Sequence, residues 1–140
     1  MKKTKYNLIN VKDAPLFVEI EINNKRCAAV VDTGANFVVM DKKFAEENTM
    51  CEVDDDGSEM AGVGYSKTFE SLSFRCLMAL EDVDGNKRGY LLEGTAVDLT
   101  DLQSMCTKLI DIPVVAIIGT DWLDYWRANI DVKKKTMTLS

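Results

Sequence analysis

An all-β fold, either a barrel or a sandwich, is the architecture that this 140-residue sequence predicts. Several short segments alternate between apolar and polar residues, which is the period of a β-strand. Turn-forming residues recur about every 8 to 12 positions, the spacing of strands in sandwiches and barrels. Only two or three segments have the apolar spacing of a helix, so helices should be few and short.

The composition is that of one globular domain covering residues 1–140. Hydrophobic residues make up 46% of the chain and charged residues 29%, and the length is sufficient for a sizeable core. The net charge of −6 argues against a nucleic-acid partner, because proteins that bind nucleic acids carry a basic face. The basic run at 133–135 lies between apolar segments and is expected to be a solvated turn.

The first residues of the chain indicate the cellular compartment of the protein. Residues 1–16 are positively charged but lack the apolar stretch of a signal peptide. No apolar run approaches the roughly 20 residues that span a membrane. We therefore expect no membrane partner and a cytoplasmic location, although a trimmed signal peptide would leave the same start.

Histidine is absent, which excludes Ser-His and Cys-His catalysis and most zinc sites. The four cysteines lie about 25 to 30 residues apart without a C-x-x-C pair, and we expect neither a metal nor a cofactor. Cys27, Cys76 and Cys106 stand in apolar patterns and should be small core residues. The even number of cysteines leaves disulfides open, but a reducing compartment is the simpler interpretation.

The first part of the chain predicts three strands. Residues 15–22 alternate between apolar and polar side chains, and 23–26 follow as a hairpin turn because asparagine tolerates positive φ. Residues 27–32 form a nearly continuous apolar run, which indicates a strand buried on both faces. Residues 37–40 predict another short buried strand.

The next segment should contain a helix, a loop and a hairpin. Residues 41–48 predict one or two helical turns with Asp41 as the N-cap. Residues 51–60 are acidic and rich in turn formers, so we expect a solvated loop. Residues 60–67 contain two glycines separated by one residue, which suits a hairpin tip. Residues 68–80 then have the pattern of a long strand.

The following segment changes from strand to helix. Residues 83–88 hold an Asp-Gly turn, and 89–97 return as a strand. Residues 100–110 have helical spacing, and Thr100 and Gln103 match a capping box.

The last segment returns to strands. Residues 113–119 form an apolar strand that ends in a glycine, and 120–128 predict a short helix capped by Thr120 or Asp121. Residues 129–140 close the chain as a hairpin. The residues of this hairpin expected to point inward are Ile130, Val132, Met137 and Leu139.

Two apolar strands are each followed by a glycine-containing turn. Residues 27–32 run into Asp-Thr-Gly, and 113–119 end in a glycine. The first strand therefore leads to a carboxylate, which is either an ordinary turn aspartate or a group held for chemistry. If the two strand ends meet, Asp32 should lie near Gly119.

These residues resemble the signatures of the aspartic proteases. Asp32-Thr33-Gly34-Ala35 is similar to the active-site sequence of that family. Ile117-Ile118-Gly119 resembles the second signature, two hydrophobic residues and a glycine ahead of a short helix. Gly62-Val63-Gly64 lies between them, where the family carries its flap hairpin. With one DTG in the chain, the resemblance is to the single-domain, retroviral-type proteases (retropepsins), and GTDWL at 119–123 fits their bacterial relatives.

The resemblance implies a closed acid-protease barrel and an aspartic endopeptidase that acts as a homodimer. Asp32 from each chain would form a dyad and activate a water, which hydrolyses an extended peptide. Thr33 would bond backbone across the two-fold axis, and Gly34 would let the backbone approach the carboxylates. The residues expected to contact the substrate are Ala35, Asn36, Gly62, Val63 and Gly64.

The sequence departs from the viral relatives in two places. Asn36 and Phe37 stand where those proteins have acidic residues that hold the substrate backbone. Thr120 stands where they have an arginine that braces the region near the interface. The departures concern subsite contacts and the strength of the dimer.

Two other interpretations stay open. A retropepsin-like domain without activity would serve for dimerisation or peptide binding, and a monomer would favour it because a lone Asp32 has no partner carboxylate. A generic β-barrel interaction module with DTGA by accident predicts no convergence of residue 32 with residues 117–119.

Overall fold

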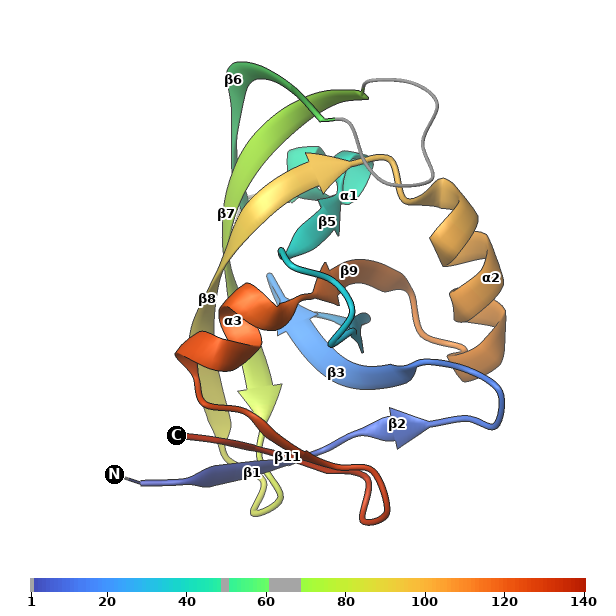
Figure 1. Ribbon diagram of the computed structural model, residues 1–140, viewed down its shortest axis with the longest axis vertical. Helices are drawn as coiled ribbons and strands as arrows, with labels where there is room; N and C mark the ends of the chain where they lie inside the picture. The colour runs from blue at the N-terminus through green and yellow to red at the C-terminus, as the bar shows by residue number, and fades with distance from the viewer. Residues whose placement is uncertain (1, 49–50, 61–68) are drawn as a thin grey trace.

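The fold is a closed β-barrel with a small terminal sheet and three helices in the described part of the chain (Figure 1). The computed structural model describes residues 2–48, 51–60 and 69–140. The predicted all-β barrel is confirmed. In chain order the elements are β1 (Thr4–Asn7), β2 (Ile9–Asn10), β3 (Leu16–Ile22), β4 (Lys25–Val31), β5 (Val39–Asp41), α1 (Lys42–Glu47), β6 (Cys51–Met60), β7 (Phe69–Glu81), β8 (Lys87–Val97), α2 (Thr100–Ile110), β9 (Val114–Ile118), α3 (Thr120–Tyr125), β10 (Asn129–Asp131) and β11 (Thr136–Leu139).

Six strands form the barrel in the order β3-β4-β9-β5-β8-β7. A pairing between Glu21 of β3 and Ala79 of β7 closes the ring. β2 extends the sheet beside β3, and β6 extends it beside β7. The terminal strands form a separate sheet in the order β1-β11-β10, so both chain ends lie close together in Figure 1.

β9 lies between β4 and β5 and positions the candidate site. β4 and β9 run parallel, with Val31 opposite Ile118. β5 runs antiparallel to β9 on its other side, with Val39 opposite Ile117. The chain that leaves β4 must therefore pass over the end of β9 before it becomes β5 (Figure 1).

Both faces of β4 are buried, as its continuous apolar run predicts. Successive side chains of a strand point to opposite faces, and here the two faces contact two different apolar clusters. One cluster fills the barrel, and the other includes Cys106 of α2. The inward set is Cys27, Ala29 and Val31, and the set beneath α2 is Ala28 and Val30.

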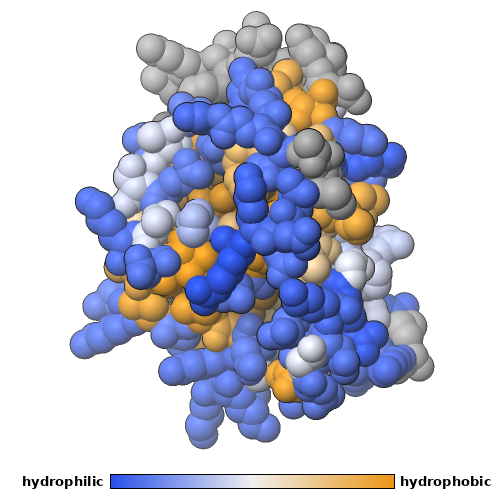
Figure 2. Space-filling view, turned by 180° about the vertical axis from the view of Figure 1, so that it is seen from behind, coloured by the Kyte–Doolittle hydropathy of each residue, from blue (hydrophilic) through white to orange (hydrophobic). Residues whose placement is uncertain are grey.

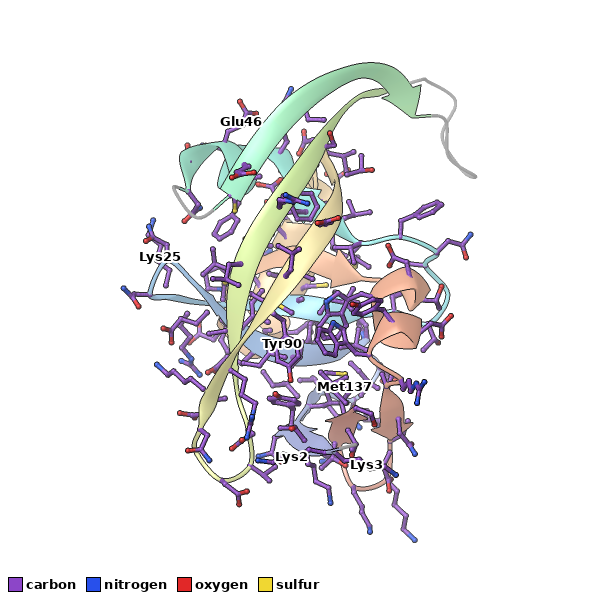
Figure 3. All side chains as sticks on the ribbon, turned by 90° about the vertical axis from the view of Figure 1, so that its left-hand side faces the viewer. Lys2, Lys3, Lys25, Glu46, Tyr90 and Met137 are labelled. Carbon is purple, nitrogen blue, oxygen red and sulfur yellow. The ribbon has the colours of Figure 1, made fainter. Side chains whose placement is uncertain are left out.

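An aromatic cluster joins the terminal sheet to the barrel. The ring of Tyr90 on β8 contacts Trp122 and Trp126, with centroid separations of 5.7 and 5.0 Å. Its hydroxyl hydrogen-bonds that of Tyr6 on β1. Figure 3 shows Tyr90 above Met137 of β11, which is also buried. The terminal sheet is therefore packed on the barrel through a buried aromatic contact.

Local signals for turns and caps are confirmed at several positions. Asn23 and Asn24 adopt φ angles of 54° and 61° in the turn between β3 and β4. Gly85 has a φ of 86° in the turn between β7 and β8. Asp41 caps α1, since its carboxylate accepts a hydrogen bond from the Phe44 amide at 3.1 Å.

Two expectations for secondary structure are wrong. Residues 51–60 form strand β6 rather than a loop, because their backbone pairs with the long strand β7. Pairing with an extended neighbour outweighs the low strand propensity of aspartate. The Thr100–Gln103 capping box is also wrong: Leu99 occupies the N-cap of α2, and the Thr100 hydroxyl donates to Asp98 instead.

Two further expectations near the end of the chain are wrong. Gly119 is the N-cap of α3 and makes no side-chain cap bond, so neither Thr120 nor Asp121 holds that position. Val132 does not point inward; it lies in the turn between β10 and β11 with 58% of its surface exposed. The other hairpin residues are buried or half-buried as predicted.

The surface is mainly hydrophilic on the face shown in Figure 2, with hydrophobic areas between the charged groups. The lysines at 133–135 are exposed, as expected of a solvated turn. No helix among the described residues has the length and apolar character needed to cross a membrane.

Candidate active site

Asp32 lies where the parallel strands β4 and β9 end together. Its amide donates to the Ile118 carbonyl at 3.0 Å, which continues the pairing of the two strands by one residue. The side chain is half-buried. The predicted meeting of the two strand ends is therefore confirmed, and the convergence contradicts the interpretation of DTGA as an accident in a generic barrel.

The turn after β4 folds back onto the Asp32 carboxylate. The Gly34 amide donates to Asp32 Oδ1 at 2.8 Å, and the Ala35 amide donates to the Asp32 carbonyl at 3.2 Å. A Cβ atom at Gly34 would lie 3.1 Å from Oδ1. Glycine at this position therefore allows the backbone to approach the carboxylate closely.

The first amides of α3 hold the loop that follows the turn. The Thr120 amide donates to the Ala35 carbonyl at 2.8 Å, and the Asp121 amide donates to the Asn36 carbonyl at 3.3 Å. The first amides of a helix have no partner inside the helix, so these bonds satisfy them without a capping side chain. This arrangement explains why the expected side-chain cap of α3 was wrong.

Asp121 braces the same loop from the other direction. Its Oδ2 accepts the Val38 amide at 3.4 Å, and its Oδ1 accepts the Trp122 amide at 2.7 Å. Both carboxylate oxygens are thus engaged by backbone amides. This geometry makes Asp121 a positioning group for the loop rather than a second acid for chemistry.

Two glycines, one in β8 and one directly after β9, leave room for the loop. A Cβ atom at Gly119 would lie 2.5 Å from the Phe37 carbonyl oxygen, and one at Gly94 would lie 2.0 Å from that of Val38. The Thr95 amide donates to this second oxygen at 3.2 Å. Gly94 was not among the residues predicted for the site, although a glycine inside a strand is a signal of close backbone approach.

The residues around Asp32 differ in exposure. Thr33, Gly34 and Asn36 are exposed, whereas Ala35 is half-buried. Phe37 has 65% of its surface exposed and presents an apolar ring beside the turn. The turn thus presents polar, small and aromatic groups together on an accessible surface.

The structure brings some of the predicted site residues together and leaves others untested. Asp32, Thr33, Gly34, Ala35 and Asn36 form one continuous turn at the end of β4. The predicted flap residues Gly62, Val63 and Gly64 lie outside the described residues.

A closed barrel in which a DTGA turn meets an apolar strand, a glycine and a short helix is the fold of the retropepsin-like aspartic proteases. The model of the aspartyl protease family matches residues 7–105, and the chain belongs to this family. No curated protein sequence matches the chain.

Solved structures of this class resemble the chain in fold. The retroviral protease-like domain of Ddi1 from Leishmania major has a TM-score of 0.55 and 21% identity, with 92% of this chain and 90% of that chain covered. A retropepsin-like aspartic protease from Rickettsia conorii has a TM-score of 0.52 and 15% identity, with 99% and 91% covered. The EIAV protease in complex with the inhibitor HBY-793 has a TM-score of 0.53 and 17% identity, with 89% and 99% covered.

Proposed function

We propose that this protein is an aspartic endopeptidase that works as a homodimer. The observation that carries the proposal is the half-buried Asp32 carboxylate, held by the Gly34 amide where β4 and β9 end. A peptide hydrolase without metal or covalent intermediate needs a base for the water and an acid for the carbonyl oxygen. The chain has one DTG sequence, so the second carboxylate comes from a second copy across a two-fold axis.

The two Asp32 carboxylates would divide the chemistry between them. Like charges in contact cannot both ionise easily, so the pair shares one proton. The ionised carboxylate takes a proton from water as the water attacks the peptide carbonyl carbon, and the protonated one donates to the carbonyl oxygen. The Gly34 amide, which donates to Oδ1, would hold the Asp32 carboxylate in a fixed orientation for the water.

The remaining predicted residues would bind and align the peptide. Thr33 would bond backbone across the two-fold axis. An extended substrate would add as a strand beside the turn, a mode in which backbone bonds supply affinity and side-chain pockets supply selectivity. The substrate-contacting residues in this proposal are Ala35, Asn36, Gly62, Val63 and Gly64.

An inactive domain for dimerisation or peptide binding is the second candidate. The terminal sheet favours its peptide-binding form, because β11 already has a strand of its own chain on each side and a lone Asp32 has no partner carboxylate. β11 cannot accept a strand from a partner, so a dimer must form through other surfaces.

The single domain over residues 1–140 and the cytoplasmic location also stay predictions.

Replacing Asp32 tests the dyad. Asp32→Asn is nearly isosteric and can keep the bond from the Gly34 amide, but it cannot accept the proton of the water. Cleavage of a peptide library should be lost at every pH tested, while the fold and the dimer persist. In the wild type, cleavage should be highest at acidic to near-neutral pH and should fall when both carboxylates ionise.

A matched control is Asp13→Asn. Asp13 is exposed and has a φ of 60°, which asparagine accepts, so cleavage should be unchanged. Equal cleavage by Asp32→Asn and wild type would exclude the dyad. A wild type that is monomeric by sedimentation and cleaves nothing would favour the inactive domain.

A further inference from the structure

Cys51 and Cys76 face each other across the antiparallel strands β6 and β7. Their Sγ atoms are 3.1 Å apart. The Cys51 amide donates to the Asn48 carbonyl at 3.1 Å. Opposite residues of an antiparallel pair have Cα atoms about 4.5 to 5.5 Å apart, within the range that a disulfide spans.

The two thiols differ in accessibility and acidity. Cys51 is half-buried, whereas Cys76 has 1% of its surface exposed. The contact with the Cys76 thiol lowers the pKa of Cys51. The same contact, together with burial, raises the pKa of Cys76. Cys51 is therefore the thiol that an oxidant in solution reaches first, and it is also the better thiolate.

We propose that Cys51 and Cys76 are the site of a reversible intramolecular disulfide that cross-links β6 to β7. The oxidant is a low-molecular-weight disulfide such as glutathione disulfide. The Cys51 thiolate attacks one sulfur of the oxidant, forms a mixed disulfide and releases one thiolate. Cys76 then loses its proton and attacks Cys51 Sγ, which forms the cross-link and releases the second thiol. Two protein thiols are oxidised and one small disulfide is reduced to two thiols.

The other two cysteines are not equivalent to this pair. Cys27 is buried in the barrel, and burial raises its pKa to about 12. Cys106 is buried in the cluster beneath α2, and burial raises its pKa as well. Buried, protonated thiols react slowly, so oxidation should be selective for Cys51.

The cross-link should stabilise the folded state. The two residues are 25 positions apart, and closing that loop restricts the unfolded chain. It also ties the first residue of β6 to the middle of a barrel strand. The proposal does not rest on protease activity, because thiol chemistry and stability measure it directly.

Peptide mapping of the full chain after incubation with glutathione disulfide tests the site. The wild type should lose two of its four free thiols and yield a peptide that links residues 51 and 76. Cys76→Ser should stop at the mixed disulfide on Cys51, and Cys51→Ser should form neither product. Cys106→Ser is the matched control and should form the same link as wild type. A mixed disulfide that persists on wild-type Cys51, or a link to Cys27, would overturn the proposal.

Thermal unfolding tests whether the disulfide stabilises the fold. Oxidation should raise the melting temperature of the wild type by about 5 to 10 °C. A reducing agent should reverse the shift, and Cys51→Ser should show none. A fully cross-linked wild type with an unchanged or lower melting temperature would contradict stabilisation by the disulfide.

Discussion

The turn at Asp32 depends on two glycines that lie far from it in the sequence. Gly94 and Gly119 come from β8 and from the end of β9, and each allows a loop carbonyl to approach closely. A Cβ atom at either position would overlap the loop backbone. In a close-packed protein such an overlap must displace one of the two segments.

Gly94→Ala should lower the free energy of unfolding by about 1 to 3 kcal/mol, because its Cβ would meet the Val38 carbonyl at 2.0 Å. Urea denaturation measures the change. Gly89→Ala on the same strand is the matched control, since its Cβ would lie 3.6 Å from Leu77 Cδ1, an ordinary contact. Equal losses in the two variants would contradict a specific clash at position 94.

At the scale of elements, Asp41 joins two helices that are far apart in the sequence. One carboxylate oxygen accepts the Phe44 amide at the start of α1, and the other accepts the Leu99 amide before α2, at 3.0 Å. The side chain is buried, so water cannot replace these partners.

Asp41→Ala should therefore cost about 2 to 4 kcal/mol of stability, more than the loss of a cap alone. Chemical denaturation gives the size of the effect, and circular dichroism confirms that the fold persists. Asp101→Ala, in the exposed first turn of α2, is the control and should cost far less. Similar losses would mean that the bond between Asp41 and Leu99 contributes little.

Asp82, in the turn between β7 and β8, should make the free energy of unfolding fall at acidic pH. Hydrogen bonds from the amide of Asn86, the side chain of Arg88 and the amide of Asp84 hold the pKa of Asp82 below its ordinary value. A lowered carboxyl pKa stabilises the folded state fully above the unfolded value of about 3.9, and this stabilisation is lost as pH falls through the folded value.

Asp82→Asn should therefore melt below wild type at pH 7, and the difference should shrink as the pH falls below about 4. Thermal melts between neutral and acidic pH measure the difference, with exposed Glu81→Gln as control. A difference that stays constant over this range would show that the charge of Asp82 has no part in it.

At the scale of the whole molecule, the hydroxyl contact between Tyr6 and Tyr90 ties the terminal sheet to the barrel. Burial and the bond to Tyr90 raise the pKa of Tyr6, so the Tyr6 hydroxyl stays protonated at neutral pH. A double-mutant cycle with Tyr6→Phe and Tyr90→Phe should give a coupling free energy of about 1 kcal/mol. Tyr125→Phe, at a residue with 77% of its surface exposed, should leave stability unchanged. Additive single losses would contradict the coupling.

The sequence predicts what short-range patterns determine. Strand period, the asparagine turn and the Asp41 cap depend on neighbouring residues, and the structure confirms them. The strand at 51–60 could not be read locally, because pairing with β7 decides it. The cap of α3 was missed for the same reason, since its partners are carbonyls of the distant loop at Ala35 and Asn36.

The pairing of Asp32 with Ile118 also has a consequence for synthesis of the chain. Asp32 is synthesised before β9, the strand that fixes its turn, and the other strands of the barrel are made before β9 as well. At usual rates of translation the interval is on the order of seconds. During that time β4 is paired with β3 but not with β9. The apolar side chains of β4 that later pack beside β9 are then still exposed to water. The site is therefore assembled late, after nearly every strand of the barrel exists.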